Sequence, residues 1–284
     1  MGAPGDRARH LGRAGVRTLD EVPLTANERQ AIEAAAATLR ARFPVTDLVL
    51  YGSKARGDSD PESDIDLLVL TSRALDHEER SGMRSHLHEI SMRYDVLLSS
   101  LTVEARSWRE GVHSVLPIHT EVEREGVWYV DRTGEPRPDR APPLSDQAPS
   151  LAPSREALVK QVVDEWVRMA DEALASARAD IDAGRRRSAI NRAYYAAFYA
   201  VSAVLLSQGR HFVKHTGVQT ALHRDLIHTG LLAVEHGKAY DELFEIRLIA
   251  DYTVTGIDAD QASRSLRQAE AIVEEMRTLL AAER

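Results

Sequence analysis

The sequence predicts an α+β protein in two parts: an N-terminal domain with a short mixed sheet and flanking helices, and a C-terminal all-α helical bundle. Three observations support this. Short apolar runs typical of buried strands occur before residue 131. Long stretches with apolar residues three or four positions apart begin near residue 155. Between them, six of the eleven prolines fall within residues 136–153, which is typical of a semi-rigid linker.

The chain therefore divides into four segments. We expect a flexible tail over residues 1–24, a folded domain over 25–131, a linker over 132–154 and the helical bundle over 155–284. Two folded domains agree with the length of 284 residues, since one domain usually has about 100–200.

The composition excludes several classes of protein. Cysteine is absent, which rules out disulfides and cysteine-based metal or nucleophile chemistry. No apolar run approaches the roughly 18 residues that span a bilayer, and the N-terminus lacks the apolar segment of a secretory signal. The net charge of −8 argues against a general nucleic-acid binder. We therefore expect a cytoplasmic protein without a membrane partner, for which RNA is a less favoured ligand.

Local signals predict the elements of the first part. Thr25 and Glu28 form a capping-box pattern, which predicts a helix from there to about Arg42. Apolar runs predict buried strands, and two further helices are expected between them. The predicted strands are Asp47–Tyr51, Ile65–Leu70, Tyr94–Leu98 and Val127–Val130, and the further helices cover Arg84–Arg93 and start at Thr102.

The second part shows only helical patterns. Leu158, Val162 and Trp166 have the spacing of one buried helix face. Alanine and leucine dominate and β-branched residues are sparse, which favours a bundle. The predicted helices are Glu156–Ala183, Arg186–Gln208, Gly217–Thr229, Ala239–Thr253 and Asp260–Ala282.

The segment that follows the first predicted strand has the features of a phosphate site. Gly52 lets the chain turn where a side chain would obstruct a ligand. Ser53 offers a hydroxyl and a backbone N–H at the start of a helix, where anions bind. Lys54 and Arg56 add positive charge nearby. We therefore expect these four residues to bind a nucleotide.

Two carboxylates follow on the second predicted strand. Asp64 and Asp66 are two positions apart, so they share a face with Cα atoms ~6.6 Å apart. Their mutual repulsion is relieved by a divalent cation, and oxygen-only ligands favour Mg²⁺. Asp95, in the third predicted strand, is another isolated acid of this kind. The alternative is that these acids only end strands at the surface.

The order Gly-Ser, short helix with Arg-Gly, then Ser-Asp-x-Asp resembles the signature of the minimal nucleotidyltransferases, in the polymerase-β-like superfamily, over roughly residues 25–131. The resemblance implies that Asp64, Asp66 and Asp95 are catalytic and hold two Mg²⁺ ions. The third acid would also be the candidate for activating an acceptor hydroxyl. The Gly-Ser turn would hold the distal phosphates of the nucleotide, and ATP would be the donor among the NTPs.

The helical part resembles the HEPN domain over roughly residues 156–280. The resemblance rests on three segments in order, which are NRAYYAAFYA (191–200), KHTGV (214–218) and IRLIADY (246–252). It implies a bundle that forms homodimers and, in many members, cleaves RNA. The two families recur as paired or fused toxin–antitoxin genes in which the transferase adds AMP to the helical partner. Aminoglycoside nucleotidyltransferases share a related two-part plan.

The sequence departs from the ribonuclease members of that family. They carry an arginine and a histidine with four to six residues between them, whereas the corresponding positions after Arg247 hold Tyr252, Thr253 and Val254. The missing imidazole predicts that the protein does not cleave RNA by the HEPN mechanism. Arg247, Asp251 and Tyr252 remain the candidate site of the helical part. The alternative is an internal Arg247–Asp251 ion pair, with Tyr252 packing or serving as a hydroxyl acceptor.

Two further clusters have simpler interpretations. The aromatic residues of NRAYYAAFYA share helix faces, and core packing explains them without a ligand. Arg185, Arg186 and Arg187 follow Gly184 at a predicted helix start, where solvated charge is favoured over an RNA contact.

Together these features predict a Mg²⁺-dependent nucleotidyltransferase. It would move a nucleoside monophosphate onto a hydroxyl of a protein or of a small molecule such as an aminoglycoside, releasing pyrophosphate. Two alternatives stay open, a ribonuclease toxin controlled by its fused transferase and a non-catalytic nucleotide sensor.

Overall fold

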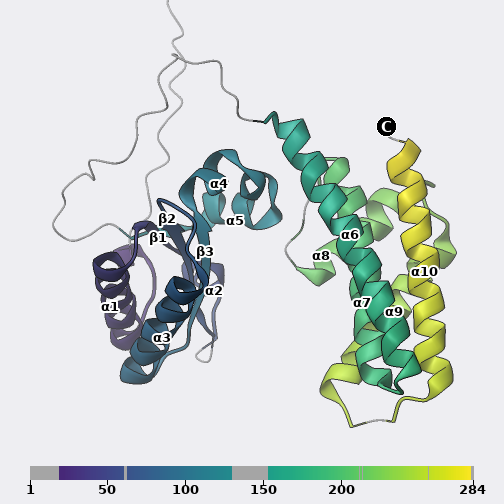
Figure 1. The fold of residues 1–284 in the computed structure, drawn as a ribbon, viewed down its shortest axis with the longest axis horizontal. Helices are drawn as coiled ribbons and strands as arrows, with labels where there is room; N and C mark the ends of the chain where they lie inside the picture. The colour runs from purple at the N-terminus through teal and green to yellow at the C-terminus, as the bar shows by residue number, and fades with distance from the viewer. Residues whose placement is uncertain are drawn as a thin grey trace, which may run out of the picture. The chain divides into compact units, whose positions relative to one another are not determined.

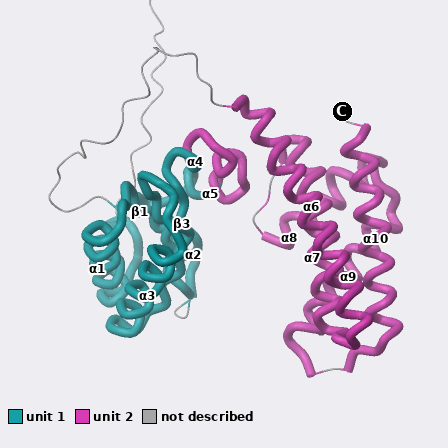
Figure 2. The backbone as a smooth tube through the Cα atoms, in the orientation of Figure 1, with its two compact units in different colours: residues 1–108, 121–149 teal, residues 109–120, 150–284 magenta. Residues whose placement is uncertain are grey.

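The computed structural model describes residues 19–60, 63–129, 153–210, 212, 214–254 and 256–282. These residues belong to two compact units, one drawn from 1–108 and 121–149 and the other from 109–120 and 150–284 (Figure 2). Residues 1–18 of the predicted tail and 132–152 of the predicted linker lie outside the described residues.

The first unit contains a four-stranded mixed sheet in the order β3–β2–β1–β4 (Figure 1). The strands are β1 Val45–Tyr51, β2 Ile65–Thr71, β3 Leu98–Glu104 and β4 Val127–Trp128. β1 pairs antiparallel with both β2 and β4, and β2 pairs parallel with β3. The predicted α+β class with a short mixed sheet is confirmed.

Two helices cover one face of this sheet, α1 (Ala26–Arg42) and α3 (His77–Tyr94) (Figure 1). The predicted capping box is present, since the Thr25 N–H donates to Glu28 Oε2 at 2.7 Å and the Glu28 N–H donates to Thr25 Oγ1 at 3.3 Å. The buried core between the helices and the sheet includes Ala31, Ile32, Ala35, Leu39, Met83, Leu87, Leu48, Leu50, Ile65, Leu67 and Val69.

The boundaries of three predicted segments were wrong. Leu19 and Val22 are buried in this core, so the folded part begins before residue 25. The strand predicted over Tyr94–Leu98 is the end of α3 followed by a turn, and β3 begins at Leu98. Thr102 lies within β3, and the helix expected there begins at Ala105. The remaining short elements of the region are η1 Leu19–Glu21, α2 Gly52–Arg56, α4 Ala105–Glu110, η2 Val112–Val115 and α5 Pro117–Glu125.

The second unit is the predicted helical bundle, drawn in green to yellow in Figure 1. Its elements are α6 Arg155–Asp182, α7 Arg186–Ser207, α8 His215–Ala221, the π-helical segment η3 Leu222–Ile227, α9 Val234–Tyr252 and α10 Ala259–Ala282. The helix predicted over Gly217–Thr229 is therefore present as α8 and the π-helical segment that directly continues it. Among the described residues no helix is both long enough and apolar enough to cross a bilayer.

Helix α7 is the centre of this bundle and packs against α6, α8, α9 and α10. Small side chains along it are fully buried, so the neighbouring helices approach its backbone closely. These buried alanines are Ala189, Ala193, Ala196, Ala197, Ala200 and Ala203.

Candidate functional site

A row of three side chains crosses the sheet of the first unit. Asp66 on β2 pairs with Tyr51 on β1 and with Ser99 on β3. Because side chains alternate along a strand, this row lies on the face opposite Ile65 and Leu67, which pack in the core under α1 and α3. Asp64, just before β2, is exposed. The structure therefore brings the two predicted carboxylates to one place.

Gly52 follows Tyr51 and lies directly against the Asp66 carboxylate. Its φ is +75°, a conformation that L side chains rarely adopt, and a Cβ built on it would overlap Asp66 Oδ2. Only glycine fits both conditions. The turn into α2, which includes Ser53, is thus held next to the carboxylate.

The surroundings of the Asp66 carboxylate raise its pKa. Burial and the charge of Asp64 raise this pKa, whereas a hydrogen bond from Ser99 and the charge of Arg56 lower it by less. Burial and then the charge of Asp66 raise the pKa of Tyr51 to about 12, so its hydroxyl stays neutral. Two carboxylates and neutral hydroxyls form an all-oxygen donor set, which fits a hard divalent cation that also binds phosphate oxygens.

The two basic residues of α2 have different surroundings. The Arg56 guanidinium pairs with Asp58 at 3.1 Å and with Glu125 at 2.9 Å, and its charge reaches Asp66. Lys54 is instead buried. Its Nζ pairs with Glu28 Oε1 at 2.6 Å and donates to the Asp60 carbonyl at 3.2 Å. The predicted nucleotide ligand Lys54 thus joins α2 to α1.

This buried pair gives a testable prediction. Replacing Lys54 by Met leaves the Glu28 carboxylate buried without its cation, and we expect the free energy of unfolding to fall by about 3–5 kcal/mol. The control is Lys160→Met, because the Lys160–Asp164 pair on α6 is largely exposed and its loss should cost about 0.5 kcal/mol or less. Urea denaturation followed by circular dichroism measures both. Equal losses in the two variants would contradict a structural role for Lys54.

Asp95 occupies a different place from the other two predicted acids. It is the C-cap of α3, with φ +52° in the left-handed region, and it precedes β3 by three positions. Ser99 stands opposite Asp66 in the register. In the described part of the chain, no group of three His, Cys, Asp or Glu side chains is placed to hold one metal ion. The expected three-acid cluster is therefore not assembled.

The candidate residues of the helical unit form an ion pair over aromatic rings. Arg247 Nε lies 2.8 Å from Asp251 Oδ2, and its guanidinium lies 5.5 and 5.9 Å from the ring centroids of Tyr194 and Tyr195. Asp251 also accepts from Asn191 Nδ2 at 2.8 Å. The third candidate, Tyr252, is 76% exposed.

The sequence interpretation missed His215 as a neighbour of this cluster. Its Nδ1 lies 2.8 Å from the Tyr194 hydroxyl, and its ring centroid lies 4.4 Å from that of Phe198. Burial and then the Arg247 charge lower its pKa, which favours the neutral imidazole. His215 is on α8 and Arg247 is on α9, and no local sequence motif links them.

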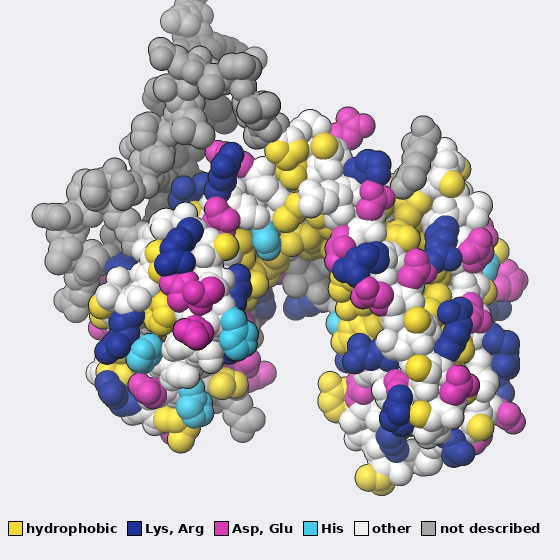
Figure 3. All heavy atoms as spheres, viewed as in Figure 1, with side chains coloured by type: hydrophobic (Ala, Val, Ile, Leu, Met, Phe, Trp, Pro, Cys, Tyr) yellow, Lys and Arg dark blue, Asp and Glu magenta, His cyan; other side chains and the backbone are white. Residues whose placement is uncertain are grey.

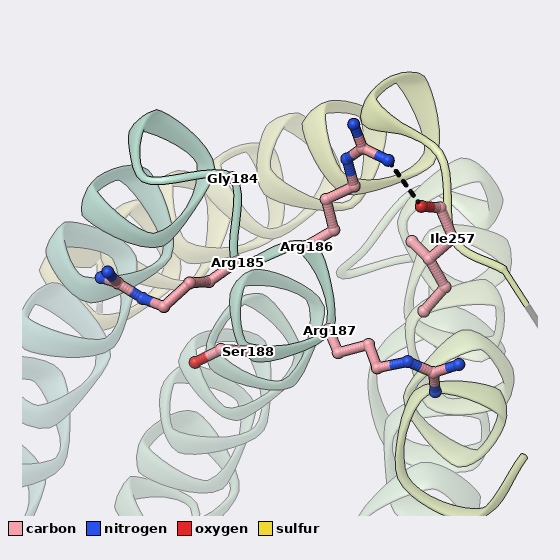
Figure 4. A pocket seen from close by; sticks show the side chains of 6 residues that line it. All are labelled: Gly184, Arg185, Arg186, Arg187, Ser188 and Ile257. Carbon is pink, nitrogen blue, oxygen red and sulfur yellow. Dashed lines mark hydrogen bonds between the residues drawn. The ribbon is translucent and has the colours of Figure 1, made fainter. Parts of the chain in front are cut away.

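The three consecutive arginines at the start of α7 are tied to neighbouring backbone and to one acid. Figure 4 shows their side chains pointing in separate directions. With Gly184, Ser188 and Ile257 they line a pocket of about 430 Å³. Arg186 donates to the Ile257 carbonyl, Arg187 donates to the Ile249 and Ala250 carbonyls, and Arg185 pairs with Asp180. Arg186 and Arg187 thus join α7 to the end of α9 and the following loop, whereas Arg185 joins the start of α7 to α6.

Comparisons with known proteins support both domains predicted from the sequence. The model of the nucleotidyltransferase domain family matches residues 32–118, and that of the HEPN domain family matches residues 163–279. The chain is therefore a nucleotidyltransferase domain fused to a C-terminal HEPN domain. It belongs to the same family as the UPF0332 protein of Thermotoga maritima, with 36% identity over 122 residues, which are 43% of this chain and 92% of that protein.

Two archaeal relatives from Methanocaldococcus jannaschii are also similar. One is named as a candidate toxin and is 25% identical over 122 residues, which cover 43% of this chain and 91% of the relative. The other is named as a candidate protein adenylyltransferase and is 37% identical over 54 residues, which cover 19% of this chain and 54% of the relative.

Proposed function

We propose that the chain is a nucleotidyltransferase that moves a nucleoside monophosphate, AMP from ATP, onto an acceptor hydroxyl. The observation that supports the proposal is the close approach of Gly52 to Asp66, because a turn that bound phosphate there would lie beside a carboxylate pair that suits a divalent cation. The acceptor oxygen would bond to the α-phosphorus while the bond to the β-phosphate oxygen breaks. The acceptor proton goes to solvent or a base, and pyrophosphate leaves.

The residues of the chain have distinct roles in this proposal. Gly52 and Ser53 would bind the distal phosphates, and Asp64 and Asp66 would hold Mg²⁺. A bound Mg²⁺ would neutralise charge on the phosphate oxygens. Arg56, held by Asp58 and Glu125, supplies positive charge near the same point. The names of the relatives support a protein acceptor more than an aminoglycoside.

Removing either carboxylate charge tests the proposal. We expect Asp64→Asn or Asp66→Asn to abolish transfer of label from α-labelled ATP while the circular dichroism spectrum stays unchanged, because Asn keeps the side-chain volume but cannot hold the cation as strongly. The melting temperature without metal should not fall, since carboxylate repulsion is relieved. Wild-type transfer by either variant would refute the role of these residues. Nucleotide binding without transfer by the wild type would favour a sensor.

We also propose that the chain is a homodimer joined through its helical unit. Exposed apolar side chains gather at the end of α9 and just beyond it, at Leu248, Ile249, Tyr252 and Val254. A second copy related by two-fold symmetry would bury this surface on both chains. Light scattering should give about twice the 31.5 kDa chain mass at micromolar concentration.

The dimer is tested further by charge substitution. Ile249→Asp should shift the mass toward 31.5 kDa, whereas Met92→Asp, at an exposed position of α3, should not. A monomeric wild type would contradict the proposal.

RNA cleavage by the helical unit is a second candidate function, favoured by the position of His215 near Arg247. We expect no cleavage, because Nδ1 of His215 is engaged with Tyr194 and Arg247 is paired with Asp251. On the face drawn in Figure 3, basic and acidic side chains are interspersed over the helical unit, without the basic stripe that typifies RNA binding. The assay uses structured and unstructured RNA with wild type, Arg247→Ala and His215→Ala. Cleavage lost in both variants would establish a ribonuclease site.

A further inference from the structure

We propose that Ser99 takes the third position of the metal-binding row in the nucleotidyltransferase domain, and that Asp95 takes no part in binding the cation. The inference rests on the proposed function for the identity of the site. It concerns which residues of this chain complete the site beside Asp64 and Asp66. It also implies that the site holds a divalent cation weakly when no nucleotide is present.

The backbone around Asp95 keeps this residue out of the sheet. α3 continues to Tyr94, and the N–H groups of Asp95 and Val96 both donate to the Ser91 carbonyl, which closes the helix end. Pairing with β2 starts only at Leu97, whose carbonyl accepts from the Ile65 N–H at 2.8 Å. Asp95 is exposed and lies two residues before that first contact.

Ser99 is placed where a third carboxylate would face the other two. The parallel register sets it beside Asp66, with Tyr51 on the other side, and its hydroxyl donates to the Asp66 carboxylate. Serine thus stands at the position beside Asp66, and its neutral oxygen adds no negative charge to the site.

The difference in charge has a consequence for metal binding. Two carboxylates carry −2, which one divalent cation balances, whereas a third would bring the site to −3. Cation affinity in oxygen-ligand sites rises with the number of charged ligands. We therefore expect the cation to bind mainly together with the phosphates of the nucleotide.

The experiment titrates the full-length chain with Mn²⁺ alone, by calorimetry and by electron paramagnetic resonance. Ser99→Asp should tighten Mn²⁺ binding by roughly tenfold or more, because it adds a charged ligand. Asp95→Asn should leave the affinity within about twofold of wild type. Asn adopts the left-handed conformation readily, so this variant keeps the helix cap. The double variant with Ser99→Asp and Asp95→Asn should bind Mn²⁺ with an affinity within about twofold of the Ser99→Asp single variant.

The outcomes separate this inference from the proposed function. The inference is overturned if Asp95→Asn weakens Mn²⁺ binding tenfold in either background. It is also overturned if the Ser99→Asp variant folds but binds Mn²⁺ no more tightly than wild type. If Ser99→Asp does not fold, the Asp95→Asn titration in the presence of ATP decides alone. A wild type that transfers no nucleotide but gains Mn²⁺ affinity through Ser99→Asp would refute the function and retain the inference. Asp66→Asn in the Ser99→Asp background should weaken binding, which assigns the Mn²⁺ to this row.

Discussion

The antiparallel pairing of β1 with β2 sets the geometry on which the candidate site of the nucleotidyltransferase domain depends. It places Tyr51 opposite Asp66, so the next residue along the chain lies over the carboxylate. Glycine is required there for two reasons, a positive φ and the lack of room for a Cβ. The Gly52–Ser53 turn and the Asp66 carboxylate are therefore not independent features. A change of register by one residue would move Asp66 into the apolar core face and separate the two.

The short helix α2 needs support from outside the site. Five residues cannot hold a helix in place by their own hydrogen bonds. The buried Lys54–Glu28 pair fixes α2 to α1, and the Glu28 side chain also closes the capping box of α1. One carboxylate thus serves the start of α1 and the position of α2. On the other side Arg56 is held by Glu125 of α5, so α2 is tied to helices at both flanks.

The sequence predicts the parts of this protein that depend on local signals. The capping box at Thr25, the apolar runs of β1 and β2 and the long amphipathic helices are all properties of contiguous residues. The start of β3 could not be placed, because the apolar segment Tyr94–Leu98 precedes a strand whose Ser99 and Ser100 weaken the strand pattern. The role of Lys54 depended on Glu28, 26 positions earlier, and the position of His215 depended on how α8 packs. These contacts are tertiary, and no local pattern encodes them.

The helical unit shows how a cluster with the composition of a catalytic site can be explained by packing. Arg247 has a carboxylate partner in Asp251 and two aromatic faces beneath it, and Asp251 has a further donor in Asn191. The charge is thus compensated without a ligand. Asn191 and the two tyrosines lie on α7, whereas Arg247 and Asp251 lie on α9, so the cluster joins the central helix to its neighbour. Arg187 extends the same contact by donating to the last carbonyls of α9.

Because these polar contacts converge on the end of α9, they hold in place the helix end that carries Leu248, Ile249 and Tyr252 to the surface. A rigid apolar surface loses less conformational entropy when it pairs than a mobile one does, so the polar cluster would favour the proposed dimer.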